Sequence, residues 1–234
     1  MMSPAAQQSG ASRPPAWPMY RALVGVGLVC GLLIVTVFVL TGPVIVRNEA
    51  AALQAAVFQV LPGAVSSRSF TLAGDDSLRP AVDGDDPQAT VHAGYDAMGK
   101  LLGIAIPAQG MGYQDVIRIL YGYSPQREAV VGMQVLASKE TPGLGDKIEK
   151  DPAFLANFRA LDVALAADGQ SLAQPVSVVK SGAKTSPWQI DGITGATISS
   201  KAIGNMLRHS TAYWVPRLYP LQRELARGGG EHGG

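Results

Sequence analysis

Residues 191–203 read Asp-Gly-Ile-Thr-Gly-Ala-Thr-Ile-Ser-Ser-Lys-Ala-Ile and stand directly before an amphipathic run over 198–209. A threonine or serine in front of such a run is typical of a helix N-cap, and Thr197 is the best cap candidate. Its hydroxyl would lie beside the free N–H groups of the helix, a place that suits a phosphate group. Gly195 and Ala196 leave the approach to that hydroxyl free of bulk. By itself the pattern also fits an ordinary capped helix, because such caps are common.

The composition is apolar for a soluble protein, since 47% of the 234 residues are hydrophobic and 16% are charged. The net charge of +1 argues against a nucleic-acid-binding surface. The single cysteine, Cys30, excludes a disulfide within the chain and iron–sulfur or zinc–cysteine sites. The histidines His92, His209 and His232 lack metal-ligand spacing, so no metal site is expected. Redox chemistry in this chain would therefore need another cofactor.

The apolar run ALVGVGLVCGLLIVTVFVL, residues 22–40, accounts for this composition. About 20 apolar residues span a bilayer. A cleaved signal peptide is the alternative, with the alanines at 50–52 as its cleavage site. The length of the run, and the charged Arg47 and Glu49 in front of those alanines, favour an uncleaved anchor. We therefore expect a transmembrane anchor over 19–46.

The charges that flank this anchor predict its orientation. Arg13 and Arg21 precede the apolar run, and Arg47, with Glu49 close by, follows it. This slight positive-inside bias places the N-terminus in the cytoplasm. The sequence thus predicts a single-pass inner-membrane protein with a disordered cytoplasmic tail over 1–18 and a periplasmic domain over 47–226. A disordered glycine-rich tail over 227–234 would follow.

The soluble part combines a few helices with a series of strands. Helical spacing predicts a helix over 48–61, and Asp151-Pro152 opens another whose apolar face would run from Phe154 to Leu165. Short turns between the strands favour an antiparallel sheet, so the fold class is α+β, a mainly antiparallel sheet with packed helices. The predicted strands are 66–72, 90–96, 103–107, 115–123, 129–137 and 175–179. The acidic stretch 74–87 is expected to be a solvated loop, with a calcium site as the alternative.

A second distinctive segment, Glu140-Thr141-Pro142-Gly143-Leu144-Gly145, follows the strand at 129–137. A proline and two glycines fix a tight loop whose backbone can approach a flat ring closely. Leu144 could lie against the apolar part of such a ring, and Glu140 and Thr141 could offer it polar groups. A plain Pro-Gly turn is the alternative for this segment taken alone.

Together, Asp191-x-x-Thr194-Gly195-Ala196-Thr197 and the segment 140–145 resemble an FMN-binding domain family. This family is found in the G subunit of the Rnf electron-transport complex and in the C subunit of the sodium-pumping quinone reductase. The resemblance implies that Thr197 carries covalent FMN through a phosphoester, which a separate flavin transferase makes from FAD. Lys201, one turn further on, is either a partner of that phosphoester or a solvated lysine. The resemblance places the cofactor beside Thr197, Asp191, Thr194, Gly195, Ala196, Lys201, Glu140, Thr141, Gly143, Leu144 and Gly145.

The resemblance implies a membrane-anchored electron carrier of an Rnf-type complex, in which electrons pass between ferredoxin and NAD and ions are pumped. Its partners would be the other membrane proteins of the complex and the transferase. The spacing reveals no general base or nucleophile dyad, so we expect no independent catalysis. The residues at 146–149 fit the Rnf protein best, whereas Ser199-Ser200-Lys201 departs from many Rnf relatives. The alternatives are another flavin-based membrane redox system, such as a quinone reductase, and an anchored binding domain without flavin.

Overall fold

The computed structural model describes residues 17–228 apart from 75 and 83. The predicted tails over 1–18 and 227–234 therefore lie largely outside the described residues, and their described ends are helical. The chain divides into two compact units, Met1–Ala50 and Ala51–Gly234.

A single helix, α1 (Trp17–Val60), begins in the first unit and ends in the second. In the described part of the chain, it is the one helix that is long and apolar enough to cross a membrane. It replaces the separate anchor and following helix of the prediction, because the helix continues through Pro43. Just before this proline, the Thr41 hydroxyl donates to the Val37 carbonyl at 2.7 Å. A single-pass membrane anchor is the role that this apolar helix suggests.

The second unit is built on an antiparallel sheet with the strand order β2-β1-β3-β4-β5-β6-β7. Two further strands, β8 (Ser177–Val179) and β9 (Gln189–Asp191), form a small parallel pair. The predicted α+β class is confirmed. The strands of the larger sheet are β1 (Ser66–Leu72), β2 (Leu78–Pro80), β3 (Thr90–Tyr95), β4 (Leu101–Met111), β5 (Val116–Ser124), β6 (Ala129–Ala137) and β7 (Leu161–Asp162).

The sequence prediction has no counterpart for β2, β7 and β9, and it makes β4 too short. The strand predicted to end at 107 continues as β4 to Met111, because Gly110 and Met111 still pair with Ile117 and Val116 of β5. The strand β2 lies in the segment predicted as loop, where it pairs with the end of β1.

The helix predicted from Asp151 is much shorter than expected. The Asp151 side chain caps α3 (Pro152–Ala156) by accepting from Ala153 N at 2.9 Å and Phe154 N at 3.1 Å. A 3₁₀ turn, η1 (Asn157–Arg159), then ends the helical segment. Leu161, predicted on the helix, instead pairs with Val130 in the sheet. Pairing with β6 has therefore overridden the local helical pattern.

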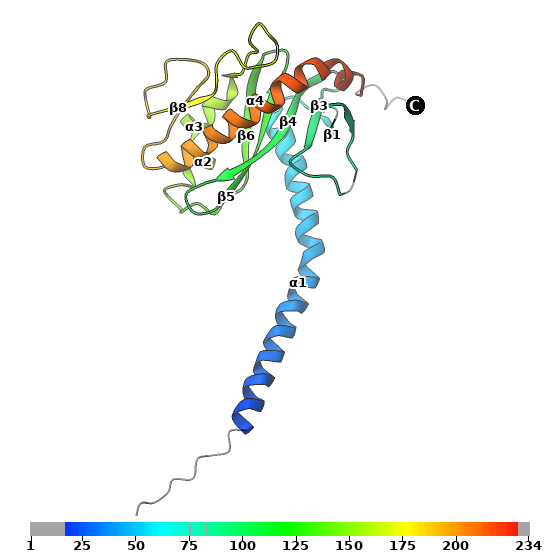
Figure 1. Cartoon of the computed structure of the whole chain (residues 1–234), viewed down its shortest axis with the longest axis vertical. Coiled ribbons are helices and arrows are strands. Elements are labelled where there is room, and N and C mark those ends of the chain that lie inside the picture. Colours follow the sequence, from blue (N-terminus) through cyan, green and yellow to red (C-terminus); the bar gives the residue numbers. More distant parts are fainter. Residues whose placement is uncertain (1–16, 75, 83, 229–234) are drawn as a thin grey trace, which may run out of the picture. The chain divides into compact units, whose positions relative to one another are not determined.

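Different helices cover the two faces of the larger sheet. The long helix α4 (Thr197–Gly228) lies across one face, as Figure 1 shows, and packs mainly against β4. It continues through Pro216 and Pro220, well beyond the predicted end of the amphipathic run at His209. The other face contacts the last turn of α1 and Leu61, which pack against alternate residues of β4 and β5 such as Ala105 and Leu120. A short helix, α2 (Lys147–Lys150), follows the loop at 140–145.

Candidate functional site

The segment between β9 and α4 forms a tight turn, which we call the threonine turn (residues 192–197). Ala196 N donates to the Ile193 carbonyl at 3.1 Å, and Gly195 has a φ of 85°, a left-handed conformation that glycine adopts readily. Ala196 is buried, whereas Thr194, Gly195 and Thr197 are exposed. The bend therefore turns the end of β9 into the start of α4 and leaves Thr197 at the surface.

The predicted cap role of Thr197 is wrong. The helix starts at Thr197 itself, and the carbonyl of Ala196 in front of it accepts from Ser200 N at 2.9 Å. Within the described part of the chain, the Thr197 hydroxyl has no hydrogen-bond partner. The hydroxyl is thus exposed and free to react or to be bonded by a ligand.

The two serines that follow are buried and bonded. Ser200 Oγ accepts from Ile193 N at 3.1 Å and donates to the Ala196 carbonyl at 2.9 Å. Ser199 is 2% exposed and donates its hydroxyl hydrogen to the Glu140 carboxylate. The threonine turn is therefore fixed from the inside, on both sides of Thr197.

Residues 140–145, which we call the Pro-Gly loop, lie against this turn. Leu144 N donates to the Thr141 carbonyl at 3.1 Å, and Gly143 has a φ of 78°. Glu140, predicted to offer a polar group to a ring, is only 6% exposed. One of its carboxylate oxygens accepts from Tyr113 N at 2.8 Å and Gln114 N at 3.1 Å, and the other accepts from Ser199. Both oxygens are thus engaged within the protein.

The Pro-Gly loop and the threonine turn enclose a cavity of about 340 Å³. Three of its apolar side chains are largely exposed, Leu144 at 52%, Ile198 at 55% and Tyr113 at 66%. This size lies within the range of small-molecule sites, and an exposed apolar rim is suited to a flat ring. The lining residues are Tyr113, Glu140, Thr141, Leu144, Gly145, Gly195, Ala196, Thr197, Ile198 and Ser199.

Three lining residues, Tyr113, Ile198 and Ser199, are not among the predicted site residues. Tyr113 follows the Gly-Met-Gly stretch at 110–112, which reads in the sequence only as a flexible corner. Ile198 belongs to the amphipathic run, where an apolar residue is expected to face the core. The structure instead exposes the Ile198 side chain at the start of α4, where it borders the cavity.

Four predicted site residues do not line this cavity: Asp191, Thr194, Lys201 and Gly143. The Asp191 carboxylate instead accepts from the backbone of the preceding loop, from Gly182 N at 3.0 Å and Ala183 N at 3.3 Å. Lys201 lines a neighbouring cavity of about 230 Å³, into which Arg208 also contributes.

A residue that the sequence reasoning missed, Asn157, holds the backbone at the start of the site. Its side-chain carbonyl accepts from Asp191 N at 3.0 Å, and its amide donates to the Asp191 carbonyl at 3.2 Å and the Phe154 carbonyl at 2.9 Å. No sequence signal marks it, because it lies inside a helical pattern.

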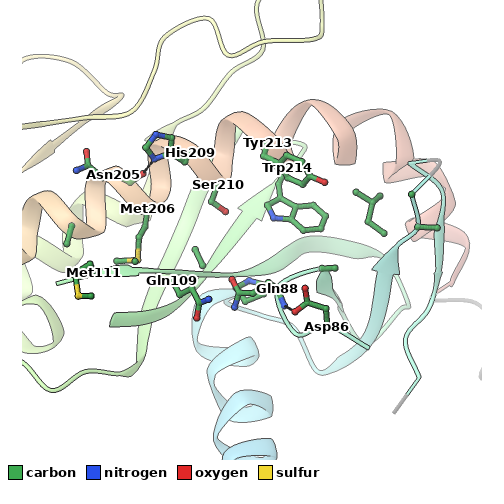
Figure 2. Close-up of a pocket in the computed structure, with 18 residues that line it drawn as sticks. Asp86, Gln88, Gln109, Met111, Asn205, Met206, His209, Ser210, Tyr213 and Trp214 are labelled. Atoms are coloured by element: carbon green, nitrogen blue, oxygen red, sulfur yellow. Dashed lines mark hydrogen bonds between the residues drawn. The ribbon is translucent and has the colours of Figure 1, made fainter. Parts of the chain in front are cut away.

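A larger cavity, of about 760 Å³, lies between α4 and the strands. Figure 2 shows Met206, His209 and Trp214 of α4 on one side of it and Gln109 and Met111 of β4 on the other. Neither Thr197 nor the Pro-Gly loop lines it. The smaller cavity is the candidate site, because it brings together Thr197 and the Pro-Gly loop.

A family model described as an FMN-binding domain matches residues 112–211, a range that contains both the Pro-Gly loop and the threonine turn. The chain is 30% identical over 192 residues to the G subunit of the ion-translocating oxidoreductase complex of Shewanella piezotolerans, with 80% of this chain and 84% of that protein covered. It therefore belongs to the G-subunit family of ion-translocating oxidoreductase complexes.

Two further comparisons concern the family and the fold. The corresponding G subunit of Methanosarcina acetivorans is 33% identical over 131 residues, which cover 56% of this chain and 61% of that relative's length. The crystal structure of the C subunit of the Na⁺-translocating NADH-quinone reductase from Parabacteroides distasonis superposes with a TM-score of 0.55. At 18% identity, with 73% of this chain and 94% of that chain covered, it shows the fold alone.

The described residues fit an FMN. The Thr197 hydroxyl is open to a phosphate group, the exposed apolar rim can cover a ring, and a Cβ added at Gly143 or Gly195 would meet no atom within 4 Å. FMN is therefore the cofactor that the FMN-binding domain and its cavity support.

Proposed function

We propose that this chain is the membrane-anchored electron-transfer subunit of an ion-translocating oxidoreductase complex and carries FMN covalently on Thr197. The convergence of the Pro-Gly loop and the threonine turn on one cavity supports this proposal most directly. The two segments lie about fifty residues apart in sequence, and the Thr197 hydroxyl where they meet is exposed and has no hydrogen-bond partner within the described residues.

In the proposed attachment, Thr197 Oγ1 forms a bond to the FMN phosphorus of FAD. The pyrophosphate bond breaks, AMP leaves, and the hydroxyl proton passes to a base of the flavin transferase. No electron is exchanged in this step. The first turn of α4 assists because its free N–H groups and dipole favour a phosphate at this end of the helix. Thr194 and Gly195, exposed beside Thr197, and Lys201 on the next turn are proposed contacts of the phosphate end.

Once bound, FMN supplies reversible electron transfer, and the protein supplies binding, position and electrostatics. The phosphoester keeps the cofactor from diffusing away. Leu144, Ile198 and Tyr113 would exclude water from part of the ring, while the open side of the cavity admits a redox partner. This division explains why no general base is needed within the chain.

The proposed setting is a membrane complex. The relatives are named as subunits of ion-translocating oxidoreductases, so we propose the other membrane proteins of such a complex as electron partners and a flavin transferase for maturation. The apolar part of α1 would anchor the chain with its N-terminus in the cytoplasm and the FMN domain, over 47–226, in the periplasm. The basic residues before the apolar run support this orientation.

The test is flavin fluorescence of the denatured protein on a gel, after co-expression with a flavin transferase. We expect Thr197→Ala to abolish the fluorescence and Thr194→Ala to retain it. Because Thr197 is exposed, its loss should change the free energy of unfolding by less than about 0.5 kcal/mol. Ser199 is excluded as a substitute acceptor by its burial and its bond to Glu140. A covalent flavin that persists in Thr197→Ala would refute the proposed attachment.

A further inference from the structure

Glu140 joins three segments that are distant in sequence. Its carboxylate accepts from the β4–β5 corner at Tyr113 and Gln114 and from Ser199 in the first turn of α4, while its own backbone begins the Pro-Gly loop. We propose that Glu140 is a positioning residue, which acts through Ser199 to hold the threonine turn in the conformation that presents Thr197 before any cofactor arrives. This inference rests on the proposed function, in which the Thr197 hydroxyl is the reacting group.

The bonding of this carboxylate is unusual for a buried acid. No cation pairs with it in the described part of the chain; its partners are two backbone N–H groups and one hydroxyl. A buried charge without a cation is costly unless its oxygens are well hydrogen-bonded. One carboxylate oxygen keeps two N–H donors, whereas the other has only the Ser199 hydroxyl in the described part of the chain. Loss of that hydroxyl therefore leaves a poorly solvated oxygen, which couples the first turn of α4 to the other two segments through the acid.

The space around Glu140 is filled. A Cβ added at Gly145 would lie 2.8 Å from the Glu140 Cβ and 2.9 Å from Ser199 Oγ. At Gly112, an added Cβ would lie 2.6 Å from Ile117 Cδ1 and too close to the carboxylate. Glycine at both positions lets the three segments close directly on the acid.

Helix geometry links this bond to the acceptor. Successive residues of an α-helix are rotated by about 100°, so Ser199 and Thr197 point to nearly opposite sides of the first turn. When Ser199 is drawn inward to Glu140, Thr197 is directed outward, as its exposure shows. Breaking the bond frees the turn to rotate or fray, which would hide or misdirect the hydroxyl.

The experiment measures the initial rate of covalent flavin attachment to the full-length chain in detergent, with a purified flavin transferase and FAD. Because a hydrogen bond to a charged group shifts an equilibrium by roughly tenfold or more, we expect Ser199→Ala to be modified about tenfold more slowly, and Glu140→Ala at least as slowly. Glu140→Gln keeps an acceptor for the two N–H groups and a polar atom for Ser199, so it should recover to within about threefold of the parent.

Thr211→Ala is the matched control for the loss of a buried hydroxyl. Thr211 lies in the same helix, is fully buried, and donates only to the Leu207 carbonyl at 2.6 Å. The control should be modified at the parental rate. A Ser199→Ala variant that is modified at the parental rate would overturn the inference.

Amide hydrogen exchange of the flavin-free chain tests the same inference without the cofactor. Ser199→Ala should raise exchange of the Ala196 and Ser200 amides and leave those of Tyr113 and Gln114 protected, whereas Glu140→Ala should raise both sets. Unchanged exchange at Ala196 and Ser200 in Ser199→Ala would refute positioning. If the parent chain itself takes up no flavin, the proposed function fails, while the exchange result still decides the role of Glu140.

Discussion

The sheet face beneath α1 and the loops around Thr197 are held together in different ways. At the first, the end of α1 rests on a glycine floor (Gly94, Gly103, Gly122 and Gly132), where backbone and Leu61 approach so closely that no Cβ would fit. At the second, buried polar side chains bond to backbone groups that no strand pairs, as Glu140, Asn157 and Ser200 do.

The difference follows from where backbone groups find partners. In the sheet, the backbone N–H and C=O groups are hydrogen-bonded between neighbouring strands. A helix can therefore pack against the sheet through close-fitting surfaces, without further hydrogen bonds. Loops have no ladder, and a buried backbone group without a partner is costly, so side chains must supply the bonds. The packed sheet thereby stabilises the fold, and the polar bonds fix the loops of the site while Thr197 stays exposed.

Gly132→Ala should have the largest effect, because it disrupts the packing of the end of α1 on the glycine floor. A Cβ there would lie 2.6 Å from the Val60 carbonyl oxygen and 2.8 Å from Val60 Cα, both of them backbone atoms that cannot rotate away. Overpacking of this kind costs about 3 kcal/mol of unfolding free energy. Denaturant unfolding of the full chain in detergent measures the loss.

Gly74→Ala is the control, because an added Cβ there meets no atom within 4 Å. Its unfolding free energy should stay within about 0.5 kcal/mol of the parent. If Gly132→Ala proved as stable as Gly74→Ala, the close contact between α1 and the sheet would not exist in solution.

Asn157→Ala should disrupt the loops around Thr197, with a smaller loss of unfolding free energy than Gly132→Ala. It removes the partners of the Asp191 N–H and carbonyl groups, and buried groups left unpaired cost about 2 kcal/mol in total. Thermal unfolding of the full chain measures the loss. The exposed Asn205 of α4 is the control, and Asn205→Ala should change stability by less than about 0.5 kcal/mol. Equal stabilities of the two variants would contradict the clamp on Asp191.

The same contrast explains what the sequence could predict. The weak alternation over 66–72 and the apolar, β-rich run over 129–137 predict β1 and β6 with their observed bounds. The two loops were found by their motif residues, and the structure brings both to one cavity. Their roles toward FMN stay predictions.

Long-range contacts lay beyond the sequence patterns. Leu161 fits a helical pattern in the sequence, but in the structure it pairs with β6. Asn157 has no distinctive sequence context, and its role follows only from its bonds to Asp191 of β9. Glu140 was expected to face a ligand, since nothing local indicates that Ser199 and the corner at Tyr113 would enclose it. The predicted cap lies one residue from the observed one, because composition marks the start of a helix only to within a residue or two.

The smallest expected effect on stability comes from Asp85, whose carboxylate does not line the candidate cavity, and this effect depends on pH. The Asp85 carboxylate accepts from Arg79 Nη1 at 2.9 Å, Val82 N at 2.9 Å and Thr71 Oγ1 at 2.9 Å. The Arg79 guanidinium, followed by the Val82 N–H, holds the pKa of this carboxyl well below its usual range. Its folded pKa is thus lower than the unfolded value of about 3.9, so its contribution is complete above that pH and is lost as the pH falls toward the folded pKa.

We therefore expect Asp85→Asn to lower the unfolding temperature at pH 6, and the difference from the parent to shrink steadily as the pH is lowered from 4 to 2. Circular dichroism at each pH measures it. A difference that stays constant over this range would mean that the carboxylate acts by shape and not by charge. Flavin attachment at pH 7 should be unchanged in this variant, because the Arg79–Asp85 pair belongs to the β1–β3 connection and none of its bonds reaches the Pro-Gly loop or the threonine turn.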